Sequence, residues 1–150
     1  MVDPSLEEIF PGLKGQAYEI KSPSDHRYNC MAWAAGDTRN WWWPVPADED
    51  TWPAGVAREL TVPAFREAFA TLGYAECAED RLEAGYEKVA LFALAGTPKH
   101  VSRQLPSGRW TSKLGKKQDI EHELHDLTGM LYGSVALVLK RPAPAAGATA

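Results

Sequence analysis

The sequence is poor in cysteine, has no long apolar run and carries no excess of positive charge. Two of its 150 residues are cysteines, and no segment approaches the roughly 20 apolar residues that span a bilayer. Lys and Arg number 16 against 20 Asp and Glu, which leaves a net charge of −4. Nucleic-acid binding draws most of its affinity from clustered basic residues, so we expect no nucleic-acid partner and no insertion into a membrane.

A recognisable targeting signal is also missing. Residues 1–4 have no basic flank and lead into no apolar run, whereas a secretory signal has both. We therefore expect a cytoplasmic protein, in which thiols usually stay reduced. Cys30 and Cys77 could form one disulfide, but this compartment favours two free thiols.

The composition is that of an ordinary globular domain, with 45% apolar and 24% charged residues. A chain of this size can bury its own core. Periodicity, caps and turn residues predict helices at 6–10, 28–36, 61–72 and 119–127, and strands at 17–20, 88–94, 99–105, 109–114 and 133–139. This order indicates a single α+β domain over residues 1–141. The Pro- and Ala-rich residues 142–150 are expected to be a disordered tail.

Cys30 is the first candidate for chemistry, because it opens a short buried helix. Asn29 is a good N-cap and Gly36 a good C-terminal stop for that helix. A thiol in the first turn meets free backbone amides, which favour the thiolate and lower the thiol pKa. The other interpretation is that Cys30 is a small core residue among apolar neighbours.

His100 is the second candidate, on a strand whose alternation puts it on the same face as Ser102. If residues 106–108 form the hairpin turn, Ser112 is a diagonal cross-strand neighbour of His100. Ser112 could then hold the imidazole, as the third member of a nucleophile–base–orienter triad does. A shift of one residue in register would bring Thr111 into that place instead.

A cysteine that opens a buried helix, followed by a β-meander with a histidine and a polar hairpin partner, resembles the papain-like superfamily. The likeness is greatest to the compact NlpC-type cell-wall peptidases and amidases. It implies N-terminal helices packed on an antiparallel β-meander, with Cys30 as nucleophile, His100 as base and Ser112 as the orienting residue. It further implies a hydrolase without a cofactor that acts on an amide or thioester bond of a peptide, amide or protein substrate. Residues 28–37 and 100–115 are also similar to a bacterial family with no assigned activity, which implies no substrate.

The tryptophans around residues 41–52 form the third candidate feature. Their indoles could line a groove for an extended peptide or a sugar, or fold back to cover the core. The alternative function is therefore a catalytically inactive papain-like module that binds a protein partner through this loop. The expected substrate-binding residues are Tyr28, Asn29, Trp41, Trp42, Trp43, Trp52 and Trp110.

A metal site is not expected. His26, Cys30, Cys77 and His100 are suitable zinc ligands, but they lack the close paired spacings of recognisable zinc sites. His122 and His125 lie three residues apart, whereas the metalloprotease helix needs four. We expect both of these histidines at the surface of a helix.

Overall fold

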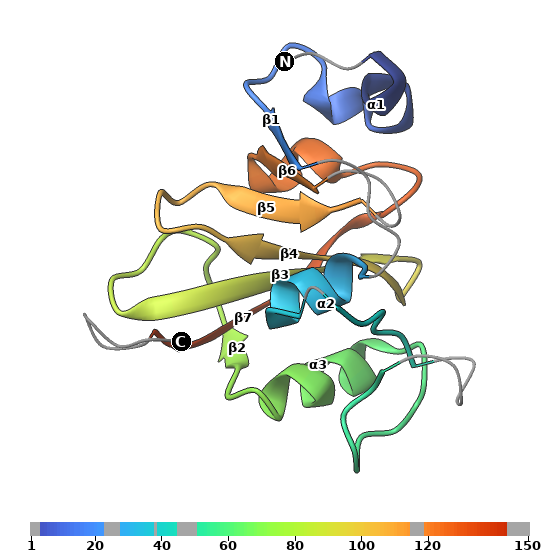
Figure 1. Cartoon of the computed structure of the whole chain (residues 1–150), viewed down its shortest axis with the longest axis vertical. Helices are drawn as coiled ribbons and strands as arrows, with labels where there is room; N and C mark the ends of the chain where they lie inside the picture. The colour runs from blue at the N-terminus through green and yellow to red at the C-terminus, as the bar shows by residue number, and fades with distance from the viewer. Residues whose placement is uncertain (1–3, 23–27, 38, 45–50, 115–118, 144–150) are drawn as a thin grey trace.

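A seven-stranded sheet organises the computed structural model, which describes residues 4–22, 28–37, 39–44, 51–114 and 119–143. The strand order is β1-β6-β5-β4-β3-β7-β2, and the six strand pairings are antiparallel (Figure 1). The strands are β1 (Glu19–Ser22), β2 (Ala75–Cys77), β3 (Tyr86–Leu94), β4 (Thr97–Gln104), β5 (Trp110–Lys113), β6 (Asp119–His122) and β7 (Ser134–Pro142). The helices are α1 (Pro4–Ile9), α2 (Cys30–Ala35) and α3 (Val62–Ala70), with 3-10 turns η1 (Pro11–Leu13) and η2 (Leu124–Leu127). The predicted mixture of helices and an antiparallel sheet is confirmed.

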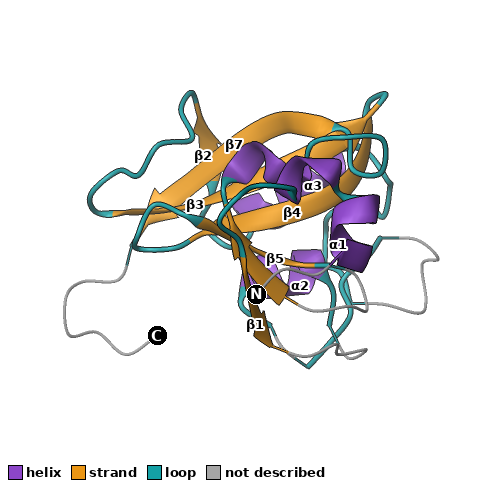
Figure 2. Ribbon diagram, turned by 90° about the horizontal axis from the view of Figure 1, so that it is seen from above, coloured by secondary structure: helices purple, strands orange, loops and turns teal. Residues whose placement is uncertain are grey.

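The two faces of the sheet carry separate apolar cores. Helices α2 and α3 cover one face, where Met31 and Phe65 pack with Val101 of β4. On the other face, α1, η1 and η2 contribute to a core that includes Phe92 of β3 and Ile120 of β6. Figure 2 shows the sheet edge-on, with its curvature and the helices around it. None of the described helices is long and apolar enough to cross a membrane.

Helix α2 begins and ends where its capping residues predict. The Asn29 side chain accepts a hydrogen bond from the backbone N–H of Ala32 at 3.1 Å, which satisfies one of the free donors of the first turn. Gly36 ends the helix in the left-handed conformation, with φ of 86°, which glycine adopts without steric cost. Cys30 is therefore the first helical residue, as predicted.

The β4–β5 hairpin has the predicted three-residue turn at 106–108. Leu105 and Arg109 close it through a backbone hydrogen bond of 2.7 Å. The ladder then pairs Arg103 with Thr111. This register puts Ser112, and not Thr111, on the face of the sheet that carries His100.

Three expectations about the C-terminal part need correction. Residues 119–127 are not one helix, because residues 119–122 pair as β6 with both β1 and β5 and only 124–127 wind into η2. The predicted strand 133–139 continues to Pro142, and Ala143 donates a backbone hydrogen bond to Gly85. The expected tail therefore does not begin at Pro142, and residues 144–150 lie outside the described part of the chain.

The short strand β2, at residues 75–77, has no counterpart among the elements that the sequence predicts.

Candidate functional site

His100 lies in the interior on β4, with none of its surface exposed. Its ring stacks on Tyr132 at a centroid distance of 4.2 Å and meets the Phe92 ring edge-on at 5.5 Å. Burial, with a smaller effect from nearby His122, holds the pKa of His100 well below its usual value. The imidazole is therefore neutral at neutral pH.

Ser112 is the centre of a buried polar network. Its hydroxyl lies 2.8 Å from Nε2 of His100, 2.7 Å from Nε2 of His122 and 2.6 Å from the Ser102 hydroxyl. The expected contact between His100 and Ser112 is thus confirmed, on the predicted register. The network also contains His122, a residue expected at the surface.

The hydrogen-bond partners assign the protons of this network. Nδ1 of His122 lies 2.7 Å from the backbone carbonyl of Glu123; because a carbonyl only accepts, Nδ1 carries the proton. Burial lowers the pKa of His122 to about 4, so at neutral pH its Nε2 has only a lone pair and accepts the Ser112 hydroxyl proton. Ser112 has no second proton, so Nε2–H of His100 donates to it. Nδ1 of His100 is left with a lone pair.

That Nδ1 atom is buried and has no hydrogen-bond partner in the described structure. Buried polar atoms are nearly always paired in folded proteins, so an orphan calls for an explanation. A neutral imidazole held by its protonated nitrogen, with the other nitrogen free, is arranged as a general base. The arrangement can take up a proton at Nδ1 of His100.

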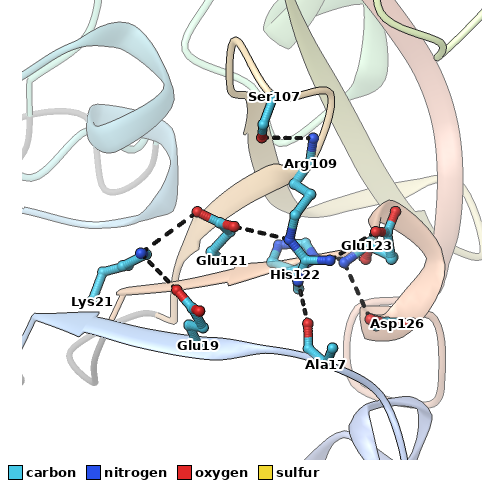
Figure 3. Close-up of polar contacts among 9 residues, drawn as sticks. All are labelled: Ala17, Glu19, Lys21, Ser107, Arg109, Glu121, His122, Glu123 and Asp126. Atoms are coloured by element: carbon cyan, nitrogen blue, oxygen red, sulfur yellow. Dashed lines mark hydrogen bonds and ion pairs between the residues drawn. The ribbon is translucent and has the colours of Figure 1, made fainter. Parts of the chain in front are cut away.

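The two residues that flank His122 in the sequence, Glu121 of β6 and Glu123 before η2, are both ion-paired. Arg109 forms ion pairs with Glu121 at 2.9 Å and with Glu123 at 2.8 Å, and its third nitrogen donates to the carbonyl of Ala17. Figure 3 shows these contacts of Arg109 next to the His122 ring. The alternation of apolar Ile120 with His122 is a strand signal that would have placed both side chains inward.

Cys30 also lies in the interior, with 5% of its surface exposed. Burial raises the pKa of its thiol to about 11, although hydrogen bonding by the backbone of Val101, Met31 and Cys30 itself opposes the shift. The predicted lowering of this pKa is therefore wrong, because desolvation outweighs the amides at the helix start. The thiol is protonated at neutral pH.

The structure does not bring Cys30 and His100 into hydrogen-bond contact. Neighbouring residues of a strand point to opposite faces: Val101 packs with Met31 of α2, whereas His100 meets Phe92 on the other face. The thiol lies against the backbone of β4 at Val101, one residue after His100. Burial raises the pKa of the Tyr132 hydroxyl, and Cys30 lies close enough for a thiolate there to add to this shift. Because the Tyr132 ring stacks on His100, the thiol is near the His100 ring without a hydrogen bond to it.

Tyr28 and Asn29, both predicted to bind substrate, are buried next to the thiol. The Tyr28 ring stacks on Trp33 at 5.7 Å, and Asn29 donates a 2.6 Å hydrogen bond to the backbone carbonyl of Trp42. Asn29 therefore holds the tryptophan segment against the start of α2. Their role in substrate binding stays a prediction.

Of the four tryptophans at residues 41–52, two pack edge-on against α3, and three are partly exposed. Trp52 is buried and, like the partly exposed Trp43, packs edge-on against Phe65 of α3. Trp42 is partly exposed, and its indole N–H donates to Asp37 at 2.8 Å. Trp41 is also partly exposed. Much of this segment therefore covers the α3 side of the core, and residues 45–50 lie outside the described part.

Trp110, the first residue of β5, is buried in the core on the α1 face and borders a small surface hollow of about 280 Å³ together with Asp80, Glu123 and His125. Of the residues considered above as zinc ligands, Cys30 and Cys77 are free thiols, and His26 lies outside the described residues. No cluster of three potential metal ligands occurs within the described ranges.

Comparison with known proteins adds a family but no activity. A family model described as "Domain of unknown function (DUF7689)" matches residues 19–140. Neither the curated proteins nor the solved structures contain a match. Because the matched region covers well over half of the sequence, including β1 through most of β7, the chain belongs to the DUF7689 family.

Proposed function

We propose that the chain is a cysteine hydrolase of the papain-like type, which cleaves an amide or thioester bond with Cys30 as nucleophile and His100 as base. The observation that carries the proposal is the lone pair on Nδ1 of His100, which is buried and without a partner. Ser112 holds the opposite nitrogen at 2.8 Å, as the orienting member of a triad does. The Cys30 thiol lies against the backbone of the next residue, Val101.

The reaction proceeds in two acyl transfers. The Cys30 thiol gives its proton to Nδ1 of His100 as its sulfur bonds to the carbonyl carbon of the substrate. The tetrahedral intermediate collapses, and the leaving amine or thiol takes the proton back from His100. Water then attacks the thioester on Cys30, with His100 again accepting and returning a proton. The chain is left unchanged, and the substrate is hydrolysed.

Both reacting groups are neutral before the substrate binds. The thiol pKa is raised to about 11, and the imidazole pKa lies well below its usual value, so a standing thiolate–imidazolium pair is unfavourable. Proton transfer must instead accompany attack on the carbonyl, after the sulfur has come within hydrogen-bond reach of Nδ1. This mechanism needs a movement that uncovers the thiol when the acyl substrate enters.

A second candidate is a catalytically inactive papain-like module that binds a protein partner. It is favoured by the burial of Cys30, at 5% exposure, and by the absence of a hydrogen bond between the thiol and the imidazole in the described structure. In this case the network around Ser112 is purely structural. The partly exposed Trp41 and Trp42 supply the contact surface.

Turnover of a panel of acyl thioesters and peptide anilides distinguishes the two functions. The hydrolase should release product from at least one class, and Cys30→Ala should abolish that release. His100→Gln should slow it by about 100-fold or more, the usual value of a general base. His125→Gln, at an exposed histidine, should have no effect. No turnover by the wild type, or equal turnover by all variants, would refute the hydrolase.

A further inference from the structure

A groove of about 660 Å³ lies at the C-terminal end of α2, away from the site described above. It is bounded by the end of α2, by the turn that leads into β3 and by the end of β4. Cys30 is at the other end of α2, about 9 Å away for a six-residue helix. The groove is therefore separate from the thiol, and its role does not depend on the proposed hydrolase.

The strand register puts one carboxylate between two guanidinium groups on this wall of the groove. Glu87 pairs directly with Arg141 of β7, and Val89, two residues further on, pairs with Arg103 of β4. Glu87 bonds to Arg141 at 2.8 Å, and Arg141 also donates to the carbonyl of Leu72 at 2.9 Å. Glu87 also acts on the charge of Arg103 at longer range, but within the described residues Arg103 has no ion pair of its own.

Glu83, the second carboxylate of the groove, is also ion-paired. Glu83 forms ion pairs with Lys140 at 2.8 Å and with Lys88 at 3.4 Å. Among the residues that the structure describes, the Arg103 side chain forms neither a hydrogen bond nor an ion pair. Its guanidinium carbon lies 4.8 Å from the centre of the Trp33 ring, and it lines the groove.

A guanidinium that lines a groove and has no ion pair of its own favours an anionic ligand. Arg presents five N–H donors and has no acceptor, and its planar fork fits a carboxylate with two parallel hydrogen bonds. Partial burial already lowers the pKa of Arg103, so a bound carboxylate would restore the lost solvation. One positive charge without an ion pair, beside two carboxylates, suits a monoanion better than a phosphate dianion.

The rest of the groove is mostly apolar. Leu82 and Tyr86 are both exposed there, and Ala34, Leu105 and Pro106 add further apolar surface to the wall. Ligand pockets of this volume usually combine an apolar lining with a few polar anchors. We propose that the groove binds a small organic carboxylate with an apolar body, whose carboxylate is held by Arg103.

Titration of the labelled protein with N-acetyl-L-phenylalanine, followed by amide NMR shifts, tests the proposal. The acid should shift the amides around Gly36, Gly85 and Leu105, and the neutral N-acetyl-L-phenylalaninamide should bind at least about tenfold more weakly. Inorganic phosphate should also bind more weakly than the acid. Equal binding of acid and amide, or shifts confined to other regions, would overturn the proposal.

Substitutions of Arg103 and Glu87 test whether their charges control the binding of the acid. Arg103→Gln should remove the preference for the acid over the amide, whereas Arg66→Gln, at an exposed arginine that pairs with Glu76, should keep it. Glu87→Gln removes the neighbouring carboxylate and should tighten binding of the acid severalfold, which provides a test even if Arg103→Gln does not fold. Unchanged affinity in Glu87→Gln, or an unchanged preference in a folded Arg103→Gln, would refute the role of Arg103.

Discussion

At the scale of single residues, burial decides the protonation states of the candidate site. It raises the pKa of the Cys30 thiol to about 11 and lowers that of His100, because both neutral forms need less solvation than the charged forms. The sequence locates Cys30 at a helix start, and this position alone predicts the opposite shift for the thiol. How deeply a short helix is covered depends on contacts with β4, which no local pattern contains.

A pH titration of the Cys30 thiolate measures this effect. In Cys77→Ser, which leaves one thiol, the thiolate absorbance of the folded protein should rise only toward a midpoint near 11. Alkylation by iodoacetamide near neutral pH should be correspondingly slow and should increase about tenfold for each pH unit. A midpoint below the usual value of a free cysteine would contradict the burial.

The Ser112 hydroxyl is expected to make a large contribution to the free energy of unfolding. Ser112→Ala removes the partner of Nε2 in both His100 and His122, and each buried group left unpaired costs about 1–3 kcal/mol. Urea unfolding should show a loss of stability of at least about 2 kcal/mol. Ser107→Ala, in the exposed turn, is the control and should stay within about 0.5 kcal/mol of the wild type. Equal losses would mean that the network contributes nothing.

At the scale of elements, the loop at 129–133 places Tyr132 on the His100 ring. Gly129 and Gly133 close the loop through two backbone hydrogen bonds of 2.9 and 2.8 Å. Gly133 has φ of 75°, and a Cβ atom there would fall within the backbone of Ala93. Only glycine fits at this position.

Gly133→Ala should therefore destabilise the fold by about 2 kcal/mol or more, through backbone strain and the collision with β3. Gly129→Ala is the matched control in the same loop, since it meets no neighbouring atom and has no positive φ. Its effect should be less than about 1 kcal/mol. Thermal unfolding of both variants tests the difference, and similar melting temperatures would contradict it.

The elements that could be predicted are those with strong local signals. Asn29 and Gly36 determine the ends of α2, and the turn at 106–108 determines the β4–β5 register and with it the contact of His100 with Ser112. The local pattern predicts a helix at β6, whereas the structure has a strand there because β1 and β5 pair with its four residues on either side, which is a tertiary effect. The same pairing buries His122, which the helical pattern places at the surface.

At the scale of the whole molecule, two buried neutral histidines make stability depend on pH. Each has a folded-state pKa below the unfolded value near 6.5, and that of His122 is about 4. The unfolded chain therefore binds more protons than the folded protein below pH 6.5, so stability is complete above that pH and falls as pH decreases toward 4. The fall should approach about 1.4 kcal/mol per pH unit for each histidine.

Urea unfolding across this pH range, with matched variants, isolates the effect from that of the carboxylates. His122→Gln should reduce the pH dependence by close to one proton, whereas His125→Gln, at an exposed position, should preserve it. Identical slopes in the wild type and in His122→Gln would show that His122 is not buried in its neutral form.

The proposed role of His100 as the base for Cys30 is tested most directly by single-turnover acylation. In the Cys77→Ser background, p-nitrophenyl acetate should release a burst of one nitrophenolate per chain, and mass spectrometry should locate the acetyl group on Cys30. The burst should be absent in Cys30→Ala, at least about 100-fold slower in His100→Gln and unchanged in His125→Gln. An acetyl group on another residue, no burst, or an equal rate in His100→Gln would contradict the claim.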